Sequence, residues 1–225
     1  MKVKICGITS WADARVAVAA GADALGFIFY TKSPRRISVR EAKRIIQKLP
    51  VFVEKVGVFV DSPWQEIEEI SRSLKLTLAQ LSGEGFTSGV VKRLSVPTMR
   101  AFRVHEAFEA SMAINFLKRS KTTTVLLDAY SARLYGGTGQ CIQLERAKSL
   151  VKDISEFGYV LLAGGLTPEN VAEVICSVQP YGVDVASGVE KEAGKKDPDK
   201  VRAFIENAKS ACALGTNGTP AKVLR

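Results

Sequence analysis

A cysteine and an aspartate that each end an apolar run are the residues of this sequence best suited to proton transfer. Cys6 closes the run "VKIC" and is followed at once by Gly7, and Asp128 closes the run "TTTVLLD". A thiolate can accept a proton, and a partly buried carboxylic acid can donate one. Simpler interpretations stay open for both, because a buried cysteine is usually a small hydrophobe and a carboxylate at a strand end often binds nearby backbone.

Other polar residues could bind an anionic or hydroxylated ligand. Arg35 and Arg36 stand in "SPRR", and guanidinium groups suit a carboxylate or a phosphate, although a solvated loop would have the same composition. Asp184, inside "GVDVAS", is expected to point inward, where it could hold a sugar hydroxyl. The single histidine, His105, has no serine or cysteine near it in the sequence and is expected at the surface or at a helix cap.

Two glycine-rich turns predict a phosphate site. "AGGL" contains Gly164 and Gly165, and "SGVE" contains Ser187 and Gly188. Backbone N–H groups without side-chain cover can bind a phosphate without a lysine. Ordinary turn chemistry explains either one alone, since glycine is common wherever φ must be positive. The two together, after consecutive strands, favour phosphate binding.

The elements that must position these residues alternate regularly along the chain. Short runs rich in β-branched and aromatic residues are each followed by a segment of helical periodicity. The expected strands are residues 3–6, 23–29, 54–60, 77–82, 98–104, 123–130, 159–165 and 182–187. The helices are expected to start near Trp11, Ser38, Pro63, Thr87, Glu106, Ile142, Pro168 and Pro198.

Eight strand–helix units predict an α/β fold, a (β/α)8 TIM barrel in one catalytic domain over residues 1–212. A doubly wound open sheet is the competing arrangement, but the first turn has no glycine-rich fingerprint. Residues 213–225, rich in Gly, Thr and Pro, are expected to form a flexible tail. In such a barrel the C-terminal ends of the strands meet at one rim, so the candidate residues above should converge there.

The composition limits which binding partners and which cellular compartment are expected. The 225 residues are 46% hydrophobic with a formal charge of +9, and no run approaches the ~18 apolar residues that a membrane helix needs. The N-terminus lacks a signal-peptide layout, and the basic residues are scattered, so neither a membrane nor a nucleic acid is an expected partner. Four widely spaced cysteines argue against zinc and disulfides and favour a cytoplasmic location: Cys6, Cys141, Cys176 and Cys212.

Several segments closely resemble one known family. "KICGIT", "GADALGFIFYTKSPR", "AQLSGEG", "LLDAY…GGTG", "AGGLTPENV" and "GVDVASGVE" are similar, in the same order, to phosphoribosylanthranilate isomerase. This is the (β/α)8 enzyme of tryptophan biosynthesis, and the match runs from about Lys2 to Lys209. The resemblance implies an aldose–ketose isomerase, active as a monomer or homodimer without metal or organic cofactor. Its substrate would be a small phosphosugar, N-(5-phosphoribosyl)anthranilate, converted to 1-(2-carboxyphenylamino)-1-deoxyribulose 5-phosphate by an Amadori rearrangement.

The resemblance also implies a role for individual residues. Cys6 matches the general base that removes the proton from ribose C2, and Asp128 matches the general acid that opens the sugar ring. Arg35 matches the residue that holds the anthranilate carboxylate, and Asp184 would contact a ribose hydroxyl. The remaining substrate-binding residues implied by the match are Gln80 and Gly137, together with the phosphate-binding backbone of Gly164, Gly165, Ser187 and Gly188.

The sequence departs from the family pattern at three places. Ser82 stands where the family usually has a histidine, and Ala186 stands where it usually has a serine. Cys141-Ile142-Gln143 replaces a typical Phe-Asp-Trp segment. Because Cys6, Arg35 and Asp128 are retained, we expect the activity to persist, with effects on rate, pH optimum and the fit around the aromatic ring.

Two other functions fit the sequence less well. A histidine-pathway Amadori isomerase would show a half-barrel repeat with aspartates at the ends of the first and fifth strands, where this chain has Cys6 and Val104-His105. A barrel that only binds a phosphorylated ligand or a nucleic acid would not need an acid–base pair, and steep salt dependence of binding would support it.

Overall fold

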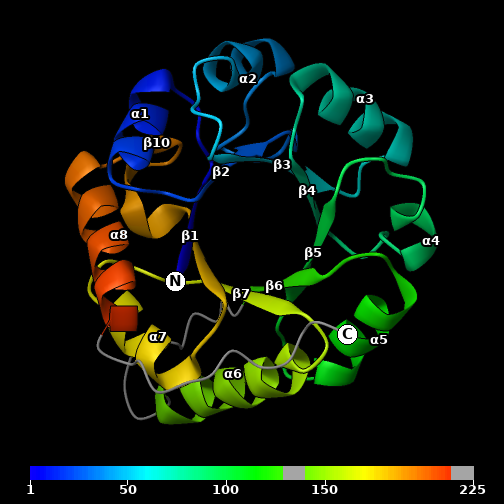
Figure 1. Ribbon diagram of the computed structural model, residues 1–225, viewed down its shortest axis with the longest axis vertical. Coiled ribbons are helices and arrows are strands. Elements are labelled where there is room, and N and C mark those ends of the chain that lie inside the picture. The colour runs from blue at the N-terminus through cyan, green and yellow to red at the C-terminus, as the bar shows by residue number, and fades with distance from the viewer. Residues whose placement is uncertain (129–139, 214–225) are drawn as a thin grey trace.

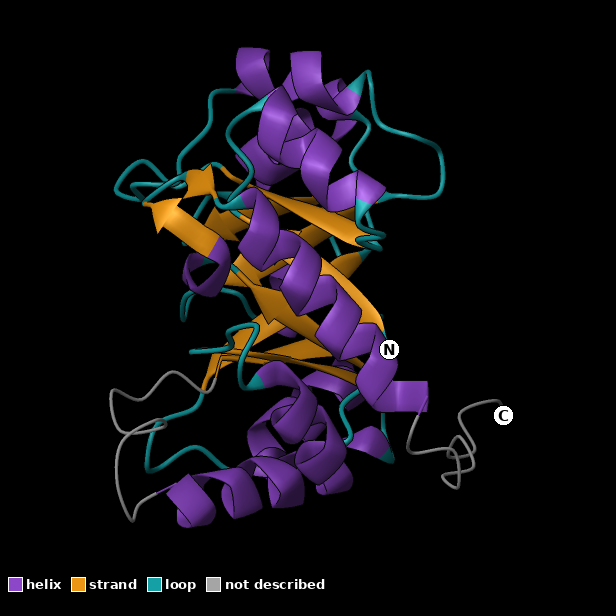
Figure 2. Ribbon diagram, turned by 90° about the vertical axis from the view of Figure 1, so that its left-hand side faces the viewer, coloured by secondary structure: helices purple, strands orange, loops and turns teal. Residues whose placement is uncertain are grey.

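The computed structural model describes residues 1–128 and 140–213, without the side chains of residues 140–143, 212 and 213. Within these ranges the chain forms a closed barrel of eight parallel strands with helices around its outside (Figure 1). The side view shows helices covering both flanks of the strand layer (Figure 2). The predicted (β/α)8 fold is confirmed. Gly137 and the predicted tail beyond Ala213 lie outside the described residues.

The elements alternate as the sequence predicts. The barrel strands are β1 Lys2–Cys6, β2 Ala24–Ile28, β3 Glu54–Val60, β4 Leu78–Ser82, β5 Thr98–Arg103, β6 Thr124–Asp128, β7 Tyr159–Ala163 and β8 Gly182–Val185. The helices are α1 Trp11–Ala19, α2 Val39–Ile46, α3 Trp64–Leu74, α4 Ser88–Val91, α5 Ala110–Arg119, α6 Gln140–Ser155, α7 Val171–Val178 and α8 Pro198–Ala213.

Side-chain hydrogen bonds explain where several of the helices begin. Ser10 and Ser38 cap α1 and α2, and the Ser38 hydroxyl and the Glu41 carboxylate form a reciprocal capping box. Helix α5 begins at Ala110, later than the expected start near Glu106. The reason is a turn in which the Phe108 backbone N–H donates to the His105 carbonyl and the Phe108 side chain is buried.

A short hairpin after β8 was not expected from the sequence. A one-turn helix, η1 Ser187–Val189, leads into β9 Glu190–Glu192, which pairs antiparallel with β10 Lys195–Lys196. Gly194 takes a positive φ of 81° in the turn between them, a conformation that favours glycine. The hairpin carries charged side chains back to the rim of the barrel.

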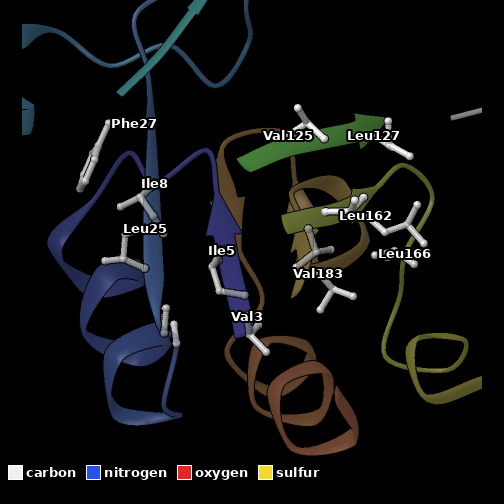
Figure 3. Close-up of a cluster of buried hydrophobic side chains, with 14 of the residues drawn as sticks. Val3, Ile5, Ile8, Leu25, Phe27, Val125, Leu127, Leu162, Leu166 and Val183 are labelled. Atoms are coloured by element: carbon white, nitrogen blue, oxygen red, sulfur yellow. The ribbon is translucent and has the colours of Figure 1, made fainter. Parts of the chain in front are cut away.

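The hydrophobic core has two parts because side chains alternate between the two faces of each strand. One face packs against the helices, as Figure 3 shows for Val3 and Ile5 of β1 and Leu25 of β2. The other face fills the barrel interior, where Met99, Leu126, Leu161 and Ala163 form a separate apolar cluster. On β1 the same alternation directs Lys4 and Cys6 inward. In the described part of the chain, no helix is long and apolar enough to cross a membrane.

Truncation of the outer core should destabilise the protein strongly. Leu25 is 0% exposed, so Leu25→Ala should lower the free energy of unfolding by about 2–5 kcal/mol through lost burial and a residual cavity. Val51→Ala, at a position that is 82% exposed, is the control and should change it by less than about 0.5 kcal/mol. Urea unfolding followed by circular dichroism measures both, and equal losses would contradict this assignment of the core.

Candidate active site

A cavity of about 170 Å³ lies at the C-terminal ends of β6, β7 and β8. Six of the predicted site residues line it: Asp128, Gly164, Gly165, Asp184, Ser187 and Gly188. Leu166 and Ala186 complete the same wall together with Ala163 and Val185. The two predicted phosphate turns and the predicted general acid therefore face one space.

Close backbone packing holds the two glycine turns together. A methyl group added to Gly188 would lie 1.8 Å from the Leu166 carbonyl oxygen, so only glycine permits this approach. Gly164 and Gly165 have φ values of 96° and 68°, which L side chains rarely adopt. Asn170 stabilises the loop after β7 with two hydrogen bonds. Its side-chain nitrogen donates to the Gly165 carbonyl at 3.0 Å, and its side-chain oxygen accepts from the Thr167 N–H at 2.9 Å.

Asp128 ends β6 in register with Arg103 of β5 and Ala163 of β7. It is half-buried, and alternation along β6 places it on the inward face, two positions after Leu126 of the interior cluster. Because Asp128 points inward at the end of the strand, its side chain lines the cavity. A partly buried carboxyl group facing a cavity is suited to donate a proton to a bound ligand.

Cys6 ends β1 with only 5% of its surface exposed, in register with Gly26 of β2. A methyl group added to Gly26 would lie 2.7 Å from Cys6 Sγ and 3.1 Å from Lys4 Nζ, so the thiol and the ammonium share the space that glycine leaves. Burial raises the pKa of the Cys6 thiol, Lys4 and Lys196 act to lower it, and Asp184 acts to raise it. The net pKa of the thiol lies above its ordinary value.

Lys4 and Asp184 form a buried ion pair across the seam between β1 and β8. The two residues are in register, and Lys4 Nζ donates to Asp184 Oδ1 at 2.8 Å. Burial acts to lower the pKa of Lys4, but Asp184 and Cys6 outweigh it and the net pKa is raised. Lys4 is therefore held as a cation, and Asp184 both pairs with it and lines the cavity.

Arg35 packs on Gly7, the residue after β1, and forms an ion pair with Glu190 of the unexpected hairpin. Arg35 Nε lies 2.9 and 3.0 Å from the two Glu190 carboxylate oxygens, and Nη2 lies 2.7 Å from Oε2. Lys196 Nζ donates to Glu190 Oε1 at 3.0 Å and to the Ala186 carbonyl at 2.9 Å. Burial opposes the charge on Glu190, but Arg35 and Lys196 outweigh it and lower its pKa.

Lys4, Glu190 and Lys196 belong to the site but were not predicted from the sequence. A charged residue at an inward position of an apolar strand could have identified Lys4, since burial of a lone charge is unfavourable. Glu190 is the last residue of the turn "SGVE", whose glycine and serine alone predicted ligand binding. The structure brings Cys6 and Arg35 beside these residues and not into the lining of the cavity.

Gln80 and His105 complete the predicted residues that the structure describes. Gln80, on β4, is 6% exposed, and its Oε1 has no hydrogen-bond partner among the described residues. His105 is exposed, as expected, and its carbonyl accepts a hydrogen bond from Arg146 Nη2. Among the side chains that the structure describes, no group of three or more His, Cys, Asp or Glu residues could hold a metal ion.

Comparison with known proteins gives consistent matches over almost the whole chain. The family model described as N-(5'-phosphoribosyl)anthranilate (PRA) isomerase matches residues 3–207. An N-(5'-phosphoribosyl)anthranilate isomerase of Trichlorobacter lovleyi is 48% identical over 211 residues, which are 94% of this chain and 99% of the relative.

Solved structures agree with the sequence relatives. A phosphoribosylanthranilate isomerase in complex with reduced 1-(o-carboxyphenylamino)-1-deoxyribulose 5-phosphate superposes with a TM-score of 0.81 at 37% identity, covering 93% of this chain and 99% of that one. Monomers generated from the dimeric Thermotoga maritima isomerase give a TM-score of 0.77 at 36% identity, with the same coverage.

Adding one methyl group should break the contact between the two glycine turns. Gly188→Ala should lower the free energy of unfolding by about 1–3 kcal/mol or more, because the Leu166 carbonyl cannot move away without shifting the loop. Gly89→Ala in the exposed helix α4 meets only ordinary contacts and should be neutral or stabilising by up to about 1 kcal/mol. Denaturant unfolding compares the two, and a neutral Gly188→Ala would refute the close contact.

The Glu190 network should make stability depend on pH. Its folded pKa lies below the ordinary 4.5, so its stabilisation is complete above pH 4.5 and is lost as the pH falls through the folded pKa. Glu190→Gln should cost about 3 kcal/mol at pH 7, and its difference from wild type should shrink steadily below pH 4.5. Thermal unfolding measured from pH 7 to pH 3 tests this, with exposed Glu156→Gln as a control that shows no such trend.

Proposed function

The chain belongs to the N-(5'-phosphoribosyl)anthranilate isomerase family of tryptophan biosynthesis, and we propose that Cys6 and Asp128 carry out the proton transfers of its reaction. The substrate would be N-(5'-phosphoribosyl)anthranilate and the product 1-(2-carboxyphenylamino)-1-deoxyribulose 5-phosphate. The observation that carries this proposal is the joint placement of a thiol, a carboxyl group and two glycine turns at the C-terminal ends of β1, β6, β7 and β8.

The rearrangement requires one acid and one base. Protonation of the ring oxygen breaks its bond to C1 and leaves an iminium group between C1 and the anthranilate nitrogen. Removal of the C2 proton then sends the C–H electron pair into a C1=C2 double bond and neutralises the iminium. The resulting aminoenol takes a proton at C1 and loses its hydroxyl proton, which gives the 2-keto product.

Asp128 is the proposed acid, and its surroundings support that role. It faces the cavity that the glycine turns line, so a sugar whose phosphate binds those turns would present its ring to this carboxyl group. The carboxyl group is half-buried at the end of β6, where it can reach a ligand bound in the cavity. Asp128 would protonate the ring oxygen from the β6 side of the cavity, and the C2 proton would then be removed by a group on the β1 side.

Cys6 is the proposed base. Its thiol ends β1 beside the Lys4–Asp184 pair, and Asp184 also lines the cavity, so the thiol lies next to the space that would hold the sugar. β1 and β6 stand apart in the closed strand order, which allows acid and base to approach the sugar from different sides. An acid and a base on opposite sides can act without neutralising each other.

The proposed binding contacts follow the charges of the ligand. The backbone of Gly164, Gly165, Ser187 and Gly188 would hold the phosphate, and Asp184 would contact a ribose hydroxyl. Arg35 would hold the anthranilate carboxylate, since Glu190 occupies its Nε and Nη2 and no described residue accepts a hydrogen bond from Nη1. The unpartnered amide oxygen of Gln80 is a further candidate for a substrate hydroxyl or amine.

Location and assembly belong to the same proposal. A reducing cytoplasm would keep Cys6 and Cys176, which are both free in the structure, as thiols. The related Thermotoga maritima protein is described as dimeric, with monomers generated from it, so both a monomer and a homodimer are compatible with this chain. Sedimentation or light scattering of the purified protein would decide between them.

Loss of either proton-transfer group should nearly abolish turnover. Wild type should quench the fluorescence of phosphoribosylanthranilate as it converts it, and Cys6→Ala and Asp128→Asn should each lower kcat by about 10²–10⁴-fold. The matched controls are Cys176→Ala and Asp153→Asn, at exposed helix positions, and they should retain wild-type rates. The same variants can be scored by growth of a tryptophan auxotroph.

Normal turnover in Cys6→Ala and Asp128→Asn would refute these roles while leaving the isomerase activity intact. No turnover by wild type, together with saturable binding of the phosphosugar, would instead support a barrel that binds its ligand without converting it.

A further inference from the structure

We propose that Lys4 is a positioning residue that stabilises the thiolate of Cys6 and so makes it competent as a base, while the Asp184 carboxylate limits this effect. The proposal rests on the role of Cys6 in the proposed function. It identifies what replaces the histidine that usually activates a cysteine, because the only histidine, His105, is exposed and lies after β5.

The strand geometry places the ammonium beside the thiol. Lys4 and Cys6 are two residues apart on β1, so both side chains point into the barrel. Gly26 of β2 faces them without a side chain, and a methyl group there would touch Cys6 Sγ at 2.7 Å and Lys4 Nζ at 3.1 Å. The absence of a side chain at Gly26 is therefore what lets the two groups approach.

Asp184 keeps Lys4 charged and in place. Lys4 is 2% exposed and would otherwise be driven toward its neutral form by burial. Its hydrogen bond of 2.8 Å to Asp184 Oδ1 uses one of the three ammonium protons, which leaves donors for the thiolate. In this arrangement the cation faces two acceptors, and the carboxylate acts against ionisation of the thiol.

Other charged groups around Cys6 are already committed to partners. Lys196 of β10 is 2% exposed and donates to Glu190 and to the Ala186 carbonyl. Arg35, after β2, packs on Gly7 and is paired with Glu190. Asp128 faces the barrel mouth from β6. Lys4 is thus the cation that shares the space at Gly26 with the Cys6 thiol.

The thiol can be titrated in the intact protein without any turnover. With cysteine labelled with ¹³C at Cβ, the resonance of Cys6 is assigned by its loss in Cys6→Ala and followed against pH. Lys4→Met should move the midpoint of this titration up by about one pH unit or more, because a stabilising positive charge is lost. Asp184→Asn should move it down, because an opposing negative charge is lost and the Lys4 ammonium then pairs with the thiolate alone, which keeps the lysine charged.

The opposite signs separate an electrostatic role from a structural one. A general loosening of the barrel would move both titrations the same way, which would overturn the proposal, as would a Lys4→Met midpoint equal to that of wild type. Lys2→Met, on the same strand with an exposed ion pair to Asp23, is the matched control and should leave the midpoint unchanged. If Lys4→Met does not fold, the double variant Lys4→Met/Asp184→Asn removes both charges and should show a smaller upward shift.

Kinetics supply the second readout. For Lys4→Met, kcat/KM should reach its plateau at a pH higher than that of wild type by the same interval as the NMR midpoint. Loss of rate with an unchanged pH profile would overturn the proposal. A Cys6→Ala variant with normal turnover would refute the base role itself, yet the NMR titration would still report on Lys4, so the two failures are distinguishable.

Discussion

The ion pair between Lys4 and Asp184 joins the first and last strands of the barrel at the point where the cylinder closes. Two charges buried in an otherwise apolar interior are tolerated only when they satisfy each other, and their register brings the two atoms to 2.8 Å. The opposite side of the interior is filled by Met99, Leu126 and Leu161. The barrel interior is therefore divided into a charged half beneath β1 and β8 and an apolar half beneath β5 to β7.

This division explains why the hairpin of β9 and β10 matters to the site. It returns Glu190 and Lys196 to the charged half, where Glu190 binds Arg35 from the loop after β2. The ion pair between Arg35 and Glu190 thereby joins the loops after β2 and β8 across β1, which lies between these two strands in the sheet. On the other side of the mouth, contact between Gly188 and the Leu166 carbonyl joins the loops after β7 and β8.

The sequence predicted the parts of the molecule that depend on local patterns. Alternation of apolar runs and helical segments predicted the barrel, and strand ends located Asp128, Gly164 and Gly188, which the structure places around one cavity. It did not predict the pairing of Lys4 with Asp184, which are far apart in the sequence and meet only because the barrel closes. The β9–β10 hairpin is too short to show alternation, so the partners of Arg35 were also missed.

The charged half of the interior has a definite electrical balance. Lys4, Lys196 and Arg35 contribute three positive charges, and Asp184 and Glu190 contribute two negative ones. With Cys6 as a neutral thiol this set carries one uncompensated positive charge, and with Cys6 as a thiolate it is electrically neutral. Departure of the thiol proton thus completes the charge balance of this half of the interior, and an anionic group that docks on Arg35 would shift that balance in favour of the protonated thiol.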